Sequence, residues 1–295
     1  MNGWLPIDKP AGITSTAAVN QLKRVLNAAK AGHAGTLDKP ATGVLAVAFG
    51  EATKTVSYAM DSRKSYTFMV RFGISTTTDD ATGTVLQTSI SRPSDEEIKA
   101  ALGHFQGNIH QVPPQYSAVK IDGKRAAAHA AAGKAKSLSA RSLTVYKLEL
   151  AGRSSPDRAM FDMECSKGGY VRSIARDLGQ LLGCYGHVEE LRRTAAGPFT
   201  LEACAAFSTE TDQQDYSALM QRLLPIEAGL SEQQELPCNR ETAVKIQHGN
   251  PVQLSATSHS SASDAMVWAS CEGRAVAIGS VIDGIFHPKR IIRQK

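Results

Sequence analysis

The sequence has few of the residues that build covalent or metal-bound frameworks. Its 295 residues include five cysteines, an odd number, and no two of them form a CxxC pair. Widely spaced cysteines of this kind argue against a disulfide framework and a zinc site, and indicate a reducing compartment. The five are Cys165, Cys184, Cys204, Cys238 and Cys271.

Long apolar runs are missing as well. No window approaches the roughly 20 apolar residues that are needed to cross a bilayer. The first residues, MNGWLPIDKP, have neither a basic start nor an apolar run. The sequence therefore predicts a cytoplasmic protein without a membrane segment.

Common catalytic signatures are absent too. The chain contains no GxSxG elbow, no Walker-type phosphate loop with its lysine, and no HExxH pair. Common cofactor and metal enzymes therefore lose support. What the chain does have is 42% hydrophobic residues over a length sufficient for one large domain and a small one.

Helices and strands are predicted in mixed order. Ser15 is predicted to cap one helix, and Ser94 and Glu97 form a capping box that begins another. Residues 170–183 repeat the helical spacing of apolar side chains. Strands are predicted from residues 44, 65, 143 and 158. Predicted strands are next to other strands in the sequence as often as they are next to helices. We therefore expect an α/β protein of the α+β type, with a mixed, largely antiparallel central sheet and flanking helices.

Positive charge is concentrated in one segment. The net charge is +5, and residues 108–145 contain six basic residues against the single acid Asp122. Within it, residues 125–140 are rich in alanine and low in complexity. The segment at about 108–141 is interpreted as an inserted arm, and contact with a polyanion and a solubilising basic face are equally good explanations of its charge.

The pattern changes again toward the C-terminus. After residue 232 the chain consists of short strands and turns, so we predict a main domain over residues 1–232 and a small β-rich module over 233–295.

One acid lies in a glycine-rich frame. Asp38 is part of GHAGTLDKPATGVL, where Gly32, Gly35 and Gly43 allow a backbone to approach a ligand closely. Taken alone, an aspartate in such a loop more often accepts hydrogen bonds from its own turn.

Five blocks of sequence, in order, resemble the bacterial TruB family, the tRNA pseudouridine-55 synthases. They are DKPAGITS from residue 8, GHAGTLDKPATGVLAVAFGEATK from 32, KSYTFMVRFGISTTTDDATG from 64, QVPPQYSAVKIDGKR from 111, and CSKGGYVRSIARDLGQLLGCYGHVEELRR from 165. The C-terminal module resembles the family's small RNA-binding PUA domain more loosely. The resemblance implies the pseudouridine synthase fold, with an RNA-gripping arm and a PUA-like module.

The resemblance also implies an activity. Such an enzyme isomerises uridine 55 in the T-loop of tRNA to pseudouridine, without a cofactor and without a protein partner. The family's essential aspartate falls on Asp38. A carboxylate can act there as a nucleophile, or it can remove a sugar proton to give a glycal, and the sequence does not choose between these routes.

Further site residues follow from the same motifs. By resemblance, Arg172 pairs with the catalytic aspartate, and Tyr66 stacks on the target base. His33 occupies the place of the flipped nucleotide, at a site where a base must be extracted from folded RNA. Tyr170 and Leu191 line the uracil pocket, and a core role for Leu191 stays open.

The remaining points leave alternatives open. Lys9 is expected to contact RNA or to hold the motif loop, with equal weight. Ala34 and Lys39 depart from the family's frequent threonine and proline. The expected partner is the T-arm of tRNA, and the expected state is a monomer.

Two other functions are kept as alternatives. One is an RNA-binding protein that clamps the T-arm without chemistry. The other is a hydrolytic nucleosidase, which needs a second acid, and Asp79 and Asp80 are the nearest candidates.

Overall fold

The computed structural model describes residues 1–210, 215–253 and 266–293. It divides the chain into two compact units. The first unit combines Met1–Lys39, Val44–Ser62 and Ala196–Lys295, and the second combines Pro40–Gly43 and Arg63–Ala195. The predicted boundary near residue 233 stays a prediction, because the first unit joins both ends of the chain.

A mixed sheet forms the centre of the fold, as the sequence predicts. Within the described residues it has nine strands, with the order β1-β3-β12-β4-β11-β10-β7, while β2 pairs with β3 and β13 with β12. In order, they are β1 (Gly3–Lys9), β3 (Thr42–Phe49), β12 (Gly186–Ala196), β4 (Lys64–Phe72), β11 (Arg158–Cys165), β10 (Arg141–Ser155) and β7 (Gly107–Gln111), with β2 (Ala31–His33) and β13 (Phe199–Thr200) beside this path. The pairs from β4 to β7 are antiparallel, and β12 runs parallel to β3. The expected mixed, largely antiparallel sheet is confirmed.

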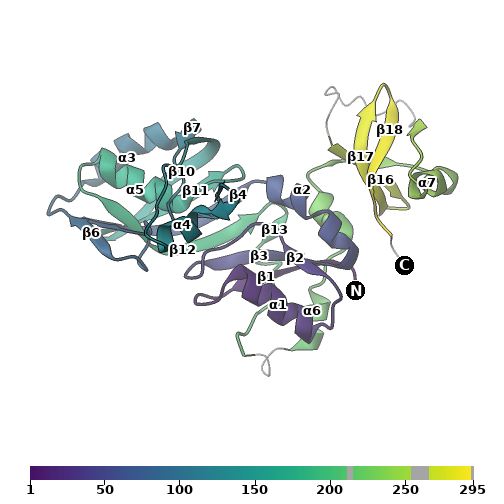
Figure 1. Cartoon of the computed structure of the whole chain (residues 1–295), viewed down its shortest axis with the longest axis horizontal. Coiled ribbons are helices and arrows are strands. Elements are labelled where there is room, and N and C mark those ends of the chain that lie inside the picture. Colours follow the sequence, from purple (N-terminus) through teal and green to yellow (C-terminus); the bar gives the residue numbers. More distant parts are fainter. Residues whose placement is uncertain (211–214, 254–265, 294–295) are drawn as a thin grey trace. The chain divides into compact units, whose positions relative to one another are not determined.

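Two helices cover part of this sheet in the second unit. They are α3 (Asp95–Leu102), which contacts β10, and α5 (Val171–Leu181), which contacts β4 (Figure 1). Alternation along β4 and β11 places Phe68 against Phe161, with ring centroids 5.5 Å apart. The capping box of Ser94 and Glu97 is present as predicted. This core fixes the start of α5, where Arg172 lies.

The first unit begins its first helix one residue earlier than expected. Helix α1 (Ser15–Val25) is capped by Thr14, whose side chain accepts a hydrogen bond from the backbone N–H of Ala17. The prediction that Ser15 is the cap was wrong, because its hydroxyl is buried and bonds elsewhere. Nearby helical segments are η1 (Gly50–Lys54), α2 (Val56–Asp61), α6 (Tyr216–Gln221) and η4 (Ile226–Leu230).

The C-terminal residues of the first unit form a second sheet. Its strand order is β14-β16-β17-β18-β15, and α7 (Arg240–Gln247) packs beside it. The strands are β14 (Gln234–Pro237), β15 (Val252–Gln253), β16 (Met266–Cys271), β17 (Arg274–Ile282) and β18 (Ile285–Ile291). The predicted β-rich character is confirmed, while residues 254–265 and 294–295 of the predicted module lie outside the described residues.

The predicted arm includes parts of the central sheet. Its first residues belong to β7 and pair with the start of β10, so residues 112–140 are the part that leaves the sheet. This excursion contains β8 (Lys120–Ile121), β9 (Lys124–Arg125) and α4 (Ala126–Ala131). Within this excursion, Val119, Ala126 and Leu138 form a small buried cluster. All six of the segment's basic residues are exposed.

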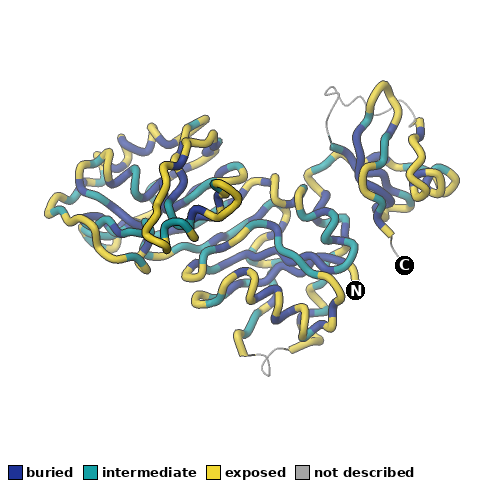
Figure 2. Tube along the Cα trace, viewed as in Figure 1, coloured by how far each residue is buried: buried dark blue, intermediate teal, exposed yellow. Residues whose placement is uncertain are grey.

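The remaining elements are short. They are β5 (Ile74–Thr76), β6 (Val85–Thr88) and η2 (Gly103–Phe105). Buried residues concentrate along the strands of both sheets, and exposed residues concentrate in the connecting loops (Figure 2).

Candidate active site

Asp38 lies on a loop that is anchored on both of its sides. The loop connects β2 to β3, and Asp38 itself is half-buried. Before it, the backbone of buried Leu37 is bonded to the hydroxyl of Ser15, with Leu37 N to Oγ at 2.9 Å and Oγ to Leu37 O at 3.0 Å. After it, the carbonyl of Lys39 accepts the backbone N–H of Gly12 at 2.9 Å. The backbone on each side of Asp38 is therefore held by residues 12–15.

Lys9 strengthens the same arrangement. Its side chain is fully buried, and its ammonium donates to the carbonyls of Pro10 at 2.8 Å, Ile13 at 2.9 Å and Lys39 at 3.4 Å. Burying a charged group is costly unless polar partners surround it, and here three carbonyls do so. Of the two roles given equal weight from the sequence, this geometry favours holding the loop.

Gly43, the second residue of β3, brings its backbone close to that of β12. Its φ is +100°, and a Cβ at this position would lie 2.1 Å from the carbonyl oxygen of Arg193. The sequence suggested that the glycines let a backbone approach a ligand. At Gly43 the close approach is instead to the protein's own backbone, where β3 pairs with β12.

The two residues that depart from the family pattern differ in burial. Ala34 is buried in the core of the first unit, and its backbone N–H donates to the carbonyl of Ala46 at 2.9 Å. Lys39 is exposed and contributes its carbonyl to the loop. His33 is half-buried at the end of β2, where it pairs with Val47 of β3.

Arg172 lies in the first turn of α5 and is 5% exposed. Its guanidinium donates to the carbonyl of Thr78 at 3.0 Å and to that of Tyr116 at 2.9 Å, and its Nε lies 3.9 Å from a carboxylate oxygen of Asp80. It therefore joins the helix to two loops. A buried guanidinium with fixed partners is a rigid donor, which suits the orientation of a carboxylate.

Both candidates for the second acid of a nucleosidase, Asp79 and Asp80, have structural partners. One carboxylate oxygen of Asp80 accepts the hydroxyls of Thr78 and Thr82, at 2.7 and 2.6 Å, and the backbone N–H of Thr82. Asp79 pairs with Arg176 at 3.1 Å, although burial raises the pKa of Asp79 above its ordinary value. These contacts give both acids a structural function, so the hydrolytic alternative loses its main support.

The start of α5 also holds the base of the excursion 112–140. The side chain of Gln111 makes two hydrogen bonds to the backbone of Tyr170. Its Oε1 accepts from the N–H of Tyr170 at 2.9 Å, and its Nε2 donates to the carbonyl of Tyr170 at 3.0 Å. The hydroxyl of Ser173 donates to the carbonyl of Val112 at 2.8 Å, and Arg176 donates to the same carbonyl at 2.9 Å. The ring of Tyr170 packs on the small cluster of the excursion.

The other predicted residues of the second unit lie on strands. Tyr66 is on β4 and Leu191 is on β12, and both are half-buried against the same hydrophobic core. The structure thus brings Tyr66 and Leu191 to one core, and Tyr170 and Arg172 to one helix start. Asp38, His33 and Lys9 belong to the first unit, so the pairing of Asp38 with Arg172 stays a prediction.

Sequence reasoning missed the residues that hold these groups. Ser15, Gln111 and Tyr116 occur inside the quoted motifs, but their role depends on partners distant in the sequence. A polar side chain within the motif was the signal for Ser15 and Gln111, whereas Tyr116 acts through its backbone carbonyl and gave no side-chain signal.

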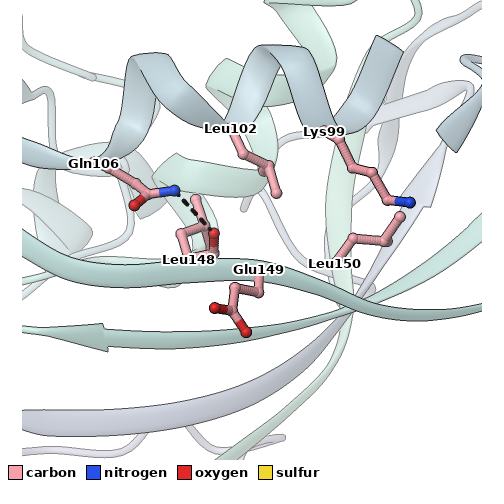
Figure 3. Close-up of a pocket in the computed structure, with 6 residues that line it drawn as sticks. All are labelled: Lys99, Leu102, Gln106, Leu148, Glu149 and Leu150. Atoms are coloured by element: carbon pink, nitrogen blue, oxygen red, sulfur yellow. Dashed lines mark hydrogen bonds between the residues drawn. The ribbon is translucent and has the colours of Figure 1, made fainter. Parts of the chain in front are cut away.

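Other features of the described residues are independent of this site. Among the described residues, no group of three or more His, Cys, Asp or Glu side chains could hold a metal ion. In the same part of the chain, no helix is long and apolar enough to cross a membrane. A groove of about 300 Å³ lies between α3 and β10 (Figure 3). It is lined by Lys99, Leu102, Gln106, Leu148, Glu149 and Leu150, and none of these is a predicted site residue.

Solved structures share the fold of this chain. The chain superposes with TM-score 0.75 on a chain of an H/ACA ribonucleoprotein bound to a substrate RNA containing 2′-deoxyuridine, at 21% identity, covering 99% of this chain and 85% of that chain. It matches a chain of a Cbf5–Nop10–Gar1 complex with the same TM-score at 23% identity, covering 99% and 84%. At these identities the likeness shows a shared fold alone.

Sequence comparison then defines the family. Residues 23–171 match the TruB family pseudouridylate synthase N-terminal domain, and residues 172–231 match the tRNA pseudouridylate synthase B C-terminal domain. The chain is 51% identical to tRNA pseudouridine synthase B of Dinoroseobacter shibae and 52% identical to that of Cereibacter sphaeroides, covering 99% of this chain and 96% of each relative. The chain belongs to the TruB family of pseudouridylate synthases, and it is an isomerase.

Proposed function

We propose that this isomerase converts uridine 55 in the T-loop of tRNA to pseudouridine, with Asp38 as the catalytic carboxylate. The observation that carries the proposal is the anchoring of Leu37 and Lys39 on the two sides of a half-buried Asp38. An active site needs a reacting group held in a fixed place, and a loop that is bonded on both sides supplies this. The names of the relatives support tRNA as the substrate.

The reaction moves one bond and one proton. The bond from the ribose C1′ to N1 of uracil breaks, the base turns, and a bond from C1′ to C5 forms. C5 then loses its proton and N1 gains one, so the product has the composition of the substrate and no cofactor is consumed. Asp38 acts either as a nucleophile or as the base that gives a glycal.

Other residues of the proposal prepare the uridine. Arg172 orients the carboxylate of Asp38, since a guanidinium pairs with a carboxylate through two parallel hydrogen bonds. Tyr66 stacks on the extracted base and takes part in moving the C5 proton, while His33 fills the vacated place in the RNA. Tyr170 and Leu191 line the pocket for uracil.

The proposed partner is the T-arm of tRNA. The six exposed basic residues of the segment 108–141 contact phosphates, and the β-rich C-terminal module adds a second RNA contact. The enzyme works as a monomer in the cytoplasm and requires no protein partner. Lys9 serves this function by holding the loop rather than by touching RNA.

The test is the mapping of pseudouridine in an unmodified tRNA transcript by carbodiimide treatment and primer extension. We expect wild-type protein and the control Glu96→Gln to give a new stop at uridine 55, since Glu96 is exposed on α3. Asp38→Asn should give no stop while it still binds the transcript. Tight tRNA binding without pseudouridine from wild type would favour the RNA clamp, and release of free uracil would favour the nucleosidase.

A further inference from the structure

Ser15 makes two hydrogen bonds to one residue of the loop that carries Asp38. Its side chain is 2% exposed. The hydroxyl donates to the carbonyl of Leu37 at 3.0 Å and accepts the N–H of Leu37 at 2.9 Å. A hydroxyl has one donor and two acceptor sites, so this single residue uses its donor and one acceptor site. Both backbone polar groups of the residue before Asp38 are thereby fixed.

The helix that begins at Ser15 does not account for this hydroxyl. The capping bond of α1 comes from Thr14. Serine also favours the helical conformation less than alanine does. The buried hydroxyl is therefore explained by the loop, where Leu37 is 3% exposed and its polar groups would otherwise be without water.

The other side of Asp38 is held separately. The carbonyl of Lys39 accepts bonds from the backbone of Gly12 and from the ammonium of Lys9. Asp38 is therefore one residue between two fixed neighbours. Loss of the Ser15 bonds releases the N-terminal side of Asp38 and leaves the bonds on its C-terminal side in place.

We propose that Ser15 is a positioning residue for Asp38, whose hydroxyl sets the place of the carboxylate through the backbone of Leu37. The inference rests on the proposed function, because it needs Asp38 to be the reacting group. Small misplacements of a reacting group reduce the rate of chemistry strongly. Binding of RNA depends on many contacts elsewhere, so the effect should fall on kcat and not on KM.

The experiment compares two neighbouring hydroxyls. Ser15→Ala removes the loop bonds, and Thr14→Ala removes the helix cap without touching the loop. For each variant, kcat, KM, the Kd for tRNA and Tm are measured. We expect Ser15→Ala to lower kcat at least fivefold with KM and Kd within twofold of wild type. Thr14→Ala should lower Tm and keep the wild-type kcat.

A second pair of variants distinguishes the effect of the hydroxyl from the effect of crowding the loop. Threonine and valine have nearly the same shape, so Ser15→Thr and Ser15→Val crowd the site equally and differ in the hydroxyl. We expect the threonine variant to have a kcat at least fivefold above that of the valine variant. Hydrogen exchange should also show a faster Leu37 amide in Ser15→Ala than in Thr14→Ala.

The outcomes separate this inference from the proposed function. A kcat of Ser15→Ala reduced less than fivefold, or reduced equally in Thr14→Ala, overturns the inference, as does equal kcat in the threonine and valine variants. If wild-type protein forms no pseudouridine at all, the proposed function fails and the inference fails with it. An active wild type with an equally active Ser15→Ala leaves the function intact and overturns the inference alone.

Discussion

Two parts of the molecule hold the proposed catalytic groups in opposite ways. In the loop from Leu37 to Lys39, the residues on either side of Asp38 are held through their backbone, and Asp38 itself is half-buried. At the start of α5, Arg172 makes the structural bonds itself and is almost fully buried. The loop around Asp38 is therefore held by bonds of the neighbouring residues, whereas the side chain of Arg172 itself bonds the segments around it.

This difference predicts how each residue responds to substitution. Where the neighbours of a residue hold the backbone, replacement of its side chain leaves those backbone bonds in place. A residue whose own side chain satisfies buried carbonyls leaves them unpaired when it is replaced, and each unpaired group costs about 1–3 kcal/mol. Stability and activity should therefore separate at Asp38 and fall together at Arg172.

The largest expected effect is that of Arg172→Lys. Lysine keeps the charge but loses the planar fork that reaches the carbonyls of Thr78 and Tyr116. We expect the free energy of unfolding to fall by about 3 kcal/mol and pseudouridine formation to fall at least about 100-fold. Denaturant unfolding and single-turnover assays measure these effects, with Asp38→Asn as the comparison that loses activity at unchanged stability. Wild-type stability in Arg172→Lys would break the contrast.

Gly43→Ala tests how the backbone contact after the Asp38 loop affects the free energy of unfolding. The backbone has a φ of +100°, and the carbonyl oxygen of Arg193 lies 2.1 Å from the position that a Cβ would take, which leaves no room for a methyl group. We expect a loss of about 3 kcal/mol in the free energy of unfolding, because the backbone of β3 or β12 must shift.

Gly32→Ala is the matched control for this change. It lies in the same motif, its φ is not positive, and nothing stands within 4 Å of a Cβ there. Its Tm should stay close to that of wild type. Equal losses in the two variants would show that the loop, and not the contact with Arg193, is sensitive to added side chains.

The sequence predicted the helices of these two regions better than the hydrogen bonds between distant residues. Helix α5 and the capping box of α3 follow from spacing within a few residues, and both are present. Thr14 and Ser15 are adjacent, and either type can cap a helix, so the sequence could not choose between them. The choice was settled by Leu37, 22 residues away, which takes the hydroxyl of Ser15.

The candidate site shows the same limit. Asp38 and Arg172 were identified by family resemblance, since a lone loop aspartate and a helical arginine have commoner explanations. The partners of Arg172 lie 94 and 56 residues away, and no local pattern encodes such contacts. Residue types were predictable, whereas the bonds between distant segments were not.

Ser173→Ala sharpens the comparison with Ser15→Ala. Both serines are buried and donate to a backbone carbonyl, but Ser173 holds Val112 at the base of the excursion 112–140. We expect a loss of about 1 kcal/mol in stability and a KM for tRNA raised a few-fold, with kcat unchanged. Steady-state kinetics on the two variants should thus give opposite patterns. A lower kcat at unchanged KM in Ser173→Ala would contradict the division of roles.

The smallest expected effect is a pH dependence at Asp79, which pairs with Arg176, four residues after Arg172 on α5. Burial raises the pKa of Asp79 above its ordinary 3.8, against the opposing effect of Arg176. A carboxyl with a raised folded pKa stabilises the protein fully below its unfolded pKa, and this contribution is lost as pH rises through the folded pKa. An asparagine at this position has no such titration, so Tm of Asp79→Asn minus Tm of wild type should increase from below pH 3.8 upward and become level above the folded pKa. Acids that do not interact with Asp79 cancel in this difference. If wild type instead gained on the variant as pH rises, the ion pair with Arg176 would outweigh burial, and the start of α5 would owe its stability to charge pairing.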